Sequence, residues 1–512
     1  MGCLQKATPW VAGLLVALTP EGFGQSGDVK GGAKPAQAAA VAEAKASPAA
    51  PTDSTAESKP ASQQVWEGKL AVGAGLSLRI VVHVSRMAGG KIRATMDSPD
   101  QGAKGLKIDS ITLDKATLAF QMNSISGKYE GKLNAEGTET QGTWSQLGMS
   151  LPLTLKKTAK PTELRRPQTP TPPFPYKLIE VTYPNKSGAV TLAGTLTEPE
   201  GSGPFPAVIL ISGSGPQDRD ETLFEHKPFL VLADALSRRG VAVLRVDDRG
   251  VGGSTGSLLN ATSDDFAGDV LTGIALLKSR PEIDARRIGL LGHSEGGIIA
   301  PMVAARSPDV AFIVLLAGTG LPGEEIAYLQ GQAVFKAMGV GDKKLTDVLD
   351  LQKRFFAILK NEKDEKAADA RMRELVRATQ ESLSEEERKA IGDIEALVTA
   401  QLKMVRTPWF RYFLSYDPRT ALAKVKCPVL ALIGQKDRQV PPKENLSQIE
   451  TTLKAAGNTA ITVKELPGLN HLFQTCTTGA PSEYAEIEET IAPVALAEIV
   501  DWITRQVGVT KP

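Results

Sequence analysis

The C-terminal part of the chain carries one pattern that restricts its fold more than any other feature. From Tyr176 onward, apolar runs of strand length alternate with helical segments. The runs are Ala207–Ser212, Val241–Asp247, Ile288–Gly292, Ala311–Ala317, Val429–Gly434 and Ile461–Leu466. Continuous apolar runs of this length are typical of parallel strands that are buried on both faces by helical crossovers. The sequence therefore predicts an α/β fold over residues 176–508.

A Gly-x-Ser-x-Gly turn, Gly292-His-Ser-Glu-Gly296, joins one of these runs (RIGLLG) to a helical segment (GIIAPMVAAR). The glycines allow a sharp strand-to-helix turn that lifts the hydroxyl of Ser294 clear of the sheet. Backbone N–H groups at the start of the following helix then face a developing oxyanion. We predict Ser294 as a nucleophile and the N–H of Glu295 as one oxyanion donor.

A nucleophilic serine needs a base, and the chain has four histidines. His83 lies in a β-rich N-terminal region, His226 precedes the serine, and the ring of His293 is expected to point away along the turn. His471 follows the last predicted strand, where the chain order of serine, acid and histidine in this kind of fold requires one. We therefore predict His471 as the general base.

The acid that orients this histidine should follow the penultimate strand. Asp437 lies in the loop directly after Val429–Gly434, and we predict that it holds the imidazole in the required tautomer. Asp417 and Glu444 remain alternatives. The first precedes that strand and the second begins a helical segment, so Asp437 is favoured.

The loop after the first core strand, Ser212-Gly-Ser-Gly-Pro-Gln-Asp-Arg-Asp220, is rich in glycine, which allows a close approach of backbone to substrate. In this arrangement the second oxyanion donor comes from that loop. We predict the N–H of Ser214 as this donor, with Gly215 as the alternative. The charged residues at the end of the loop are expected to form local salt bridges that shape it.

The segment between Ala311–Ala317 and Val429–Gly434, on the order of a hundred residues, is far longer than a crossover needs. Apolar residues within it repeat at helical spacing. We predict an inserted helical lid at about 321–416, over the carboxyl edge of the sheet. Trp409 and Phe413 lie where this segment returns to the core. They are candidates for the wall of an acyl pocket, and packing within the lid is the alternative.

The N-terminal region begins with a pattern that predicts export. Lys6 precedes the short apolar run Trp10–Leu18, and small residues follow, as in a secretory signal at 1–24. The run is too short to span a bilayer. Residues 25–63 are mostly Ala, Pro, Ser and Lys and are expected to form a disordered tether. The mature protein is therefore expected in the periplasm or outside the cell.

Residues 64–158 alternate apolar and polar residues with a period of two, between regularly spaced turns. This pattern predicts a small all-β domain, an antiparallel barrel or sandwich. A Pro-rich linker is expected at 159–175. Cys427 opens the predicted strand Pro428–Gly434, and Cys476 lies past a loop expected at the opposite end of the sheet, so both are expected to remain free thiols.

Four linked motifs of the region Tyr176–Gln506 resemble those of bacterial α/β-hydrolase esterases related to the dienelactone-hydrolase and prolyl-oligopeptidase-like group. They are Ile211-Ser-Gly-Ser-Gly-Pro-Gln-Asp-Arg-Asp, Asp248-Arg-Gly-Val-Gly-Gly-Ser, Gly292-His-Ser-Glu-Gly-Gly and Gly434-Gln-Lys-Asp-Arg-Gln-Val-Pro-Pro, and Leu469-Asn-His adds to them. The resemblance implies an α/β-hydrolase fold and a Ser-Asp-His triad, and it leaves the substrate open. Residues 66–157 resemble an accessory β-domain that some exported hydrolases carry.

Composition narrows the substrate class. The formal net charge is +1, so no strong field attracts nucleic acid or an anionic membrane. The sequence thus predicts a serine esterase that cleaves small-molecule esters of short to medium acyl chains through an acyl-enzyme. No cofactor, metal, nucleic-acid partner or integral membrane segment after processing is expected. A peptidase, amidase or thioesterase with the same triad remains open, as does a β-domain that attaches the enzyme to the envelope or a polysaccharide. The residues do not indicate an oligomeric state.

Overall fold

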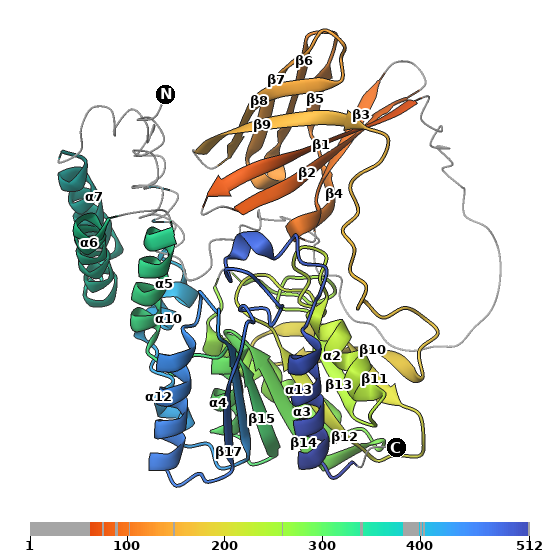
Figure 1. Ribbon diagram of the computed structural model, residues 1–512, viewed down its shortest axis with the longest axis vertical. Helices are drawn as coiled ribbons and strands as arrows, with labels where there is room; N and C mark the ends of the chain where they lie inside the picture. Colours follow the sequence, from red (N-terminus) through yellow and green to blue (C-terminus); the bar gives the residue numbers. More distant parts are fainter. Residues whose placement is uncertain are drawn as a thin grey trace, which may run out of the picture.

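The computed structural model describes residues 62–509, except 74–75, 88–90, 102, 147–148, 259, 338–340, 382–398, 400–401 and 403–404. The predicted signal segment and nearly all of the predicted tether lie outside the described residues. The remainder forms a β-domain and an α/β domain, which lie one above the other in Figure 1.

The β-domain is built from antiparallel strands, as predicted. In its described part, nine strands form one sheet in the order β4-β3-β2-β1-β9-β8-β7-β6-β5. The strands are β1 (Ser62–Gly73), β2 (Leu76–Arg86), β3 (Ile92–Ser98), β4 (Ala103–Lys107), β5 (Ser110–Leu113), β6 (Thr117–Met122), β7 (Gly127–Leu133), β8 (Glu139–Gln146) and β9 (Met149–Thr158), with single 3-10 turns at η1 (Pro99–Gln101) and η2 (Asn123–Ile125). Alternate side chains point inward and form one apolar core around Trp66, Tyr129 and Trp144.

The α/β domain contains a second sheet, whose described strands follow the order β10-β11-β13-β12-β14-β15-β16-β17. They are β10 (Tyr176–Asn185), β11 (Val190–Pro199), β12 (Phe205–Ile211), β13 (Ala242–Val246), β14 (Ile283–His293), β15 (Val310–Leu316), β16 (Val429–Gly434) and β17 (Ile461–Leu466). Strands β12 to β17 are parallel and coincide with the six predicted runs. The antiparallel pair β10 and β11, which extends the sheet beyond β13, was not predicted.

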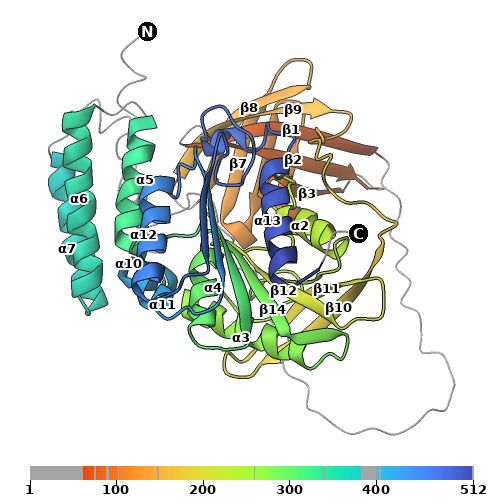
Figure 2. The same cartoon turned by 60° about the horizontal axis from the view of Figure 1, so that its bottom comes forward.

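Helices cover both faces of this sheet (Figures 1 and 2). One face packs against α3 (Ser263–Lys278), α4 (Gly296–Ala304), α11 (Arg419–Leu422) and α12 (Pro442–Ala455). The other packs against α2 (Pro228–Ser237) and α13 (Pro493–Gln506), and a 3-10 turn, η3 (Pro481–Glu483), precedes α13. These layers confirm the predicted α/β-hydrolase fold. Within the described ranges, no helix is both long enough and apolar enough to cross a membrane.

The long connection between β15 and β16 is helical, as predicted. Its described helices are α5 (Gly323–Ala337), α6 (Asp342–Asn361), α7 (Glu365–Glu381) and α10 (Pro408–Ser415), followed by the short α11 that packs on the sheet. Their apolar faces share a core of their own around Phe355, Phe356 and Phe410. Figure 2 shows that α6 and α7 stand beside α5 at the side of the sheet. Two helices of this insertion reach the carboxyl edge of the sheet. In α5 the side-chain amide of Gln330 donates to the carbonyl of Gln439 at 3.0 Å, and α10 makes the contacts of Trp409 described below.

The thiols of Cys427 and Cys476 are both free, which confirms the prediction. Cys427 precedes β16, and burial raises the pKa of its thiol to about 11. Burial also raises the pKa of Cys476. Neither thiol is therefore an activated thiolate near neutral pH.

The close packing of β14 against β15 makes one glycine a sensitive point of the α/β core. A methyl group added at Gly289 would overlap the ring of Phe312, which is almost fully buried. We expect Gly289→Ala to destabilise the α/β domain by about 1–3 kcal/mol through overpacking. A matched control is Gly268→Ala in the interior of α3, where the nearest atom would lie 3.8 Å away. Because alanine is the better helix former, that change should stabilise slightly. Calorimetric unfolding of both variants tests the difference, and equal unfolding temperatures would contradict it.

Candidate active site

Ser294 occupies a strained turn between β14 and α4. Its φ angle of 52° lies in the left-handed region, which is costly for a residue with a side chain. Its N–H donates to the carbonyl of Leu316 at the end of β15, over 2.8 Å. The motif's two glycines are required by space, because a Cβ at Gly292 would overlap the carbonyl of Gly296, and one at Gly296 would overlap that of Ile211. The turn therefore has the geometry that the sequence predicts.

Asp437 and His471 are paired at the same edge of the sheet. The Nδ1 of His471 lies 2.7 Å from Oδ2 of Asp437, and both residues are buried. The other carboxylate oxygen accepts the backbone N–H groups of Gln439 and Val440, each at 2.8 Å. These bonds fix the carboxylate and favour the tautomer with a proton on Nδ1, which leaves Nε2 as an acceptor. That Nε2 is buried and makes no hydrogen bond to any part of the protein that the structure describes.

The two rival acids lie elsewhere. Asp417 forms an ion pair with Arg419 at 2.6 Å, and the hydrogen bonds from Arg419 lower the pKa of Asp417. Glu444 lies in the first turn of α12. Of the three carboxylates considered from the sequence, Asp437 is the one that is bonded to His471.

His293 links the serine turn to the loop of His471. Its Nε2 donates to the carbonyl of His471 at 3.1 Å, and the two rings are 5.0 Å apart. Its Nδ1 lies 2.9 Å from Oε1 of Glu221. Both ring nitrogens of His293 thus bond acceptor atoms. His293 therefore cannot also serve as the base for Ser294. The sequence indicated that His293 is not the base, and it did not indicate this supporting position.

The loop after β12 lies against Ser294. A Cβ added at Gly213 would meet the Cβ of Ser294 at 3.4 Å. The N–H of Gly213 donates to Glu221 at 2.6 Å and that of Gln217 to Asp248 at 3.0 Å, so these two amides are already used. The two predicted oxyanion candidates, Ser214 and Gly215, lie between them.

Three carboxylates hold this loop in its conformation. Asp248 accepts the hydroxyl of Ser212 at 2.9 Å in addition to the N–H of Gln217, and burial raises the pKa of its carboxyl group well above the usual value. The predicted salt-bridge cluster at the end of the loop is present. Arg219 pairs with Asp247 at 2.8 Å, and Asp220 pairs with Arg245.

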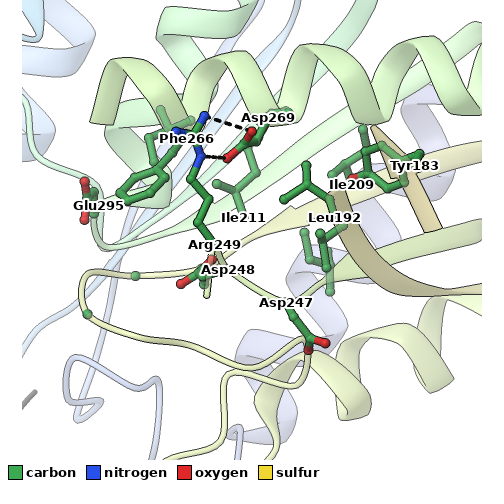
Figure 3. Close-up of a pocket in the computed structure, with 17 residues that line it drawn as sticks. Tyr183, Leu192, Ile209, Ile211, Asp247, Asp248, Arg249, Phe266, Asp269 and Glu295 are labelled. Carbon is green, nitrogen blue, oxygen red and sulfur yellow. Dashed lines mark hydrogen bonds and ion pairs between the residues drawn. The ribbon is translucent and has the colours of Figure 1, made fainter. Parts of the chain in front are cut away.

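A cavity opens beside the oxyanion loop (Figure 3). It is lined by Tyr183, Leu192, Ile209, Leu210, Ile211, Ser212, Gly213, Gly215, Val246, Asp247, Asp248, Arg249, Phe266, Asp269, Val270, Glu295 and Ile299. Figure 3 shows Arg249 bonded to Asp269, and their closest atoms are 2.5 Å apart. The charges of Arg249 and Asp269 therefore offset each other, and Asp247 is likewise paired with Arg219.

Trp409 and Phe413 lie outside the lining of this cavity but next to it. Their rings stack at 5.6 Å with an interplanar angle of 11°. The indole N–H of Trp409 donates to Oε1 of Glu295 at 2.8 Å, and the hydroxyl of Ser263 donates to the same oxygen at 2.6 Å. Phe413 is buried in the α/β core. The helical insertion is thus tied to the residue that follows Ser294.

Among the described residues, no group of three or more His, Cys, Asp or Glu side chains is placed to hold a metal ion. His83 pairs with Asp97 on the β-domain at 2.9 Å.

His226 is a buried histidine near the site. Its Nδ1 lies 2.9 Å from the hydroxyl of Thr490, and its Nε2 lies 3.0 Å from the carbonyl of Tyr484. Burial, together with the charge of Arg166, lowers the pKa of this ring to about 4. The folded protein therefore holds His226 neutral over a pH range in which the unfolded chain protonates it.

We expect this histidine to make the protein less stable in acid. The contribution of neutral His226 to the free energy of unfolding is complete above about pH 6.5. It is lost as the pH falls toward 4, because in this range only the unfolded state takes up the proton. The loss amounts to about 3 kcal/mol. The free energy of unfolding of His226→Gln, measured from pH 7 to 4, should therefore fall less steeply than that of the wild type. Parallel curves would contradict this assignment.

Comparison with known proteins agrees with the geometry. The sequence profile described as the alpha/beta hydrolase family matches residues 208–487, more than half of the chain. Esterase EstD of Thermotoga maritima is 28% identical over 284 residues, which cover 55% of this chain and 58% of that protein. Esterase FrsA of Yersinia pestis is 30% identical over 137 residues, which cover 27% of this chain and 30% of that protein. An esterase of Pyrococcus furiosus aligns with 68% of this chain and 98% of its own, at 16% identity and a TM-score of 0.40. The chain thus spans less than two thirds of these curated relatives.

Proposed function

Because the chain belongs to the alpha/beta hydrolase family, we propose that it is a serine esterase whose catalytic triad is Ser294, Asp437 and His471. One observation carries the proposal. The bond from Asp437 occupies Nδ1 of His471 and leaves a buried Nε2, which has no partner in the described structure, at the edge of the sheet where the strained turn presents Ser294. An imidazole held in this way is suited to take the proton of a serine hydroxyl.

In the proposed reaction, Nε2 of His471 takes the proton of Ser294 while the serine oxygen attacks the ester carbonyl. The N–H groups of Ser214 and Glu295 hold the oxyanion, and Asp437 stabilises the imidazolium. The tetrahedral intermediate collapses to an acyl-enzyme, and the leaving alcohol takes the proton from His471. Water then attacks the acyl-enzyme by the same route and releases the acid.

The names of the matched relatives support an ester as the substrate class, since EstD and FrsA are both esterases. We propose a small ester of short to medium acyl length. A panel of p-nitrophenyl esters, acyl thioesters and aminoacyl anilides separates this proposal from a thioesterase or a peptidase. We also propose export of the chain, because Lys6 and the apolar run Trp10–Leu18 form a signal pattern.

Removal of the triad groups should remove turnover without unfolding the protein. We expect Ser294→Ala and His471→Ala each to lower kcat for p-nitrophenyl butyrate by on the order of 10⁶-fold, because the residues act as a unit. Asp437→Asn should cost about 10⁴-fold, since the imidazole loses its orienting partner. The control is Asp417→Asn, which removes the rival acid paired with Arg419 and should leave kcat close to normal. Near-normal turnover by Ser294→Ala would overturn the assignment.

The contact of Trp409 with Glu295 generates a prediction on acyl length. In a closed acyl pocket each added methylene contributes about 0.8 kcal/mol until the chain meets the wall. We expect kcat/KM to rise from acetyl to butyryl or hexanoyl esters and then to fall. Trp409→Ala should move this optimum to longer chains, whereas Trp409→Phe, which keeps most of the ring bulk, should leave it in place. A flat profile up to palmitoyl esters in all three proteins would show that the helical insertion does not limit acyl length.

A further inference from the structure

The β-domain makes a buried polar contact with the α/β domain. The guanidinium of Arg79, in β2, bonds Asp100 in η1 at 2.6 Å and reaches Glu225 of the α/β domain at 2.9 Å. Both Arg79 and Asp100 are buried. The backbone carbonyl of Asp100 accepts the N–H of Phe224 at 3.0 Å. The β-domain is therefore bonded through side chain and backbone to the loop after β12.

An apolar cluster, here called the docking cluster, surrounds these bonds. It contains Leu78, Phe224 and Tyr484, with Val72, Leu223, Leu472 and Ala485 packed against them. Leu78 and Val72 belong to the β-domain, Leu223 and Phe224 to the loop after β12, and the others to the segment that follows His471. Leu472 is the residue directly after the proposed base. In Figure 1 the β-domain lies over the end of the α/β domain where η3 and these loops are found.

The loop after β12, which the β-domain contacts, has a strained backbone. Glu221, Phe224 and Glu225 have φ angles of 52°, 50° and 62°, all in the left-handed region. Residues with side chains remain there only where surrounding contacts determine the conformation. For Phe224 and Glu225, part of those contacts comes from Asp100 and Arg79 of the β-domain.

The same loop holds the catalytic elements. The buried carboxylate of Glu221 accepts the N–H of Gly213, in the oxyanion loop, and bonds the ring of His293, which in turn bonds the carbonyl of His471. One side chain thus connects the oxyanion loop, the serine turn and the histidine loop.

The segment after His471 carries a second connection. The hydroxyl of Tyr484, a member of the docking cluster, accepts Nε2–H of Gln439 at 3.1 Å, and the backbone N–H of Gln439 donates to Asp437. Arg166, just before the Pro-rich stretch, donates to the carbonyls of Phe224 and Ala485, both at 2.8 Å. The docking cluster is therefore linked to the loops of all three proposed triad residues.

We propose that the docked β-domain is required for full activity of the esterase site. Its contacts hold the strained loop after β12 in one conformation. Within that loop, Glu221 is a positioning residue whose bonds fix the oxyanion loop and, through His293, the loop of His471. The inference rests on the proposed function of Ser294. A β-domain that only attached the enzyme to another surface would make a different prediction. In that case, separating the two domains would leave turnover of small esters unchanged.

The first experiment weakens the contact between the two domains in the full-length chain, with one substitution in the β-domain and one in the α/β domain. Leu78→Asp places a carboxylate in the docking cluster, and Leu78 is not part of the β-domain's own core. Glu225→Ala removes the partner of Arg79 from the α/β side, at a partly exposed position. The matched control is Leu178→Asp on β10, where the same change falls on a side chain that is 47% exposed. Circular dichroism and thermal unfolding report whether each variant folds.

For p-nitrophenyl butyrate we expect Leu78→Asp to lower kcat about ten- to a hundredfold with a change in KM of less than about threefold, because a displacement near 1 Å is costly to an aligned site. Glu225→Ala should lower kcat about three- to tenfold, since one hydrogen bond to a charged group is lost. Leu178→Asp should match the wild type. If the wild type is active and both docking variants turn over like Leu178→Asp, the inference is wrong and the esterase proposal stands. If the wild type cleaves no ester, both are wrong.

The second experiment tests the route through Glu221. Glu221→Gln keeps one acceptor oxygen and should lower kcat less than Glu221→Ala does, which removes both bonds. In the double variant Leu78→Asp/Glu221→Gln the combined loss of kcat should be smaller than the product of the two single losses, since both act on the same loop. A loss equal to the product would show that docking acts by another route and would overturn the role of Glu221.

Discussion

The left-handed turn at Ser294 is the constraint around which the α/β domain is organised. A residue with a side chain can hold this conformation only because Gly292 and Gly296 let the ends of β14 and α4 approach the neighbouring backbone. The central parallel strands bring their carboxyl ends to one edge, so the loops after β12, β16 and β17 reach the same turn. The Asp437–His471 pair and the oxyanion loop follow from that convergence.

The buried carboxylates around the turn of Ser294 all have hydrogen-bond donors as partners. Asp437 is bonded to two backbone N–H groups and to His471, Glu221 to Gly213 and His293, and Glu295 to Ser263 and Trp409. Unpaired buried charge is expensive, so each of these groups is held in one position by several donors.

The sequence predicted those parts of the site that depend on local chain geometry or on strand order. The strand-to-helix turn of Ser294, the position of Asp437 after β16 and that of His471 after β17 all follow from the parallel sheet, and the structure places these residues as expected. The roles of Glu221 and His293 could not be predicted. Their contacts depend on a strained loop whose path is set by the β-domain. Neither hydrophobic periodicity nor the spacing of motifs in the sequence indicates such a contact. The edge strand β10 and its neighbour β11 were missed because polar residues interrupt their apolar pattern.

The two elements that border the site differ in how they are held. The helical insertion has an apolar core of its own, to which Phe410 of α10 belongs. It meets the catalytic loops through the indole hydrogen bond of Trp409 and through the bond from the Gln330 amide to the carbonyl of Gln439. The β-domain shares a partly exposed ion pair, a backbone hydrogen bond and an apolar cluster with the catalytic loops.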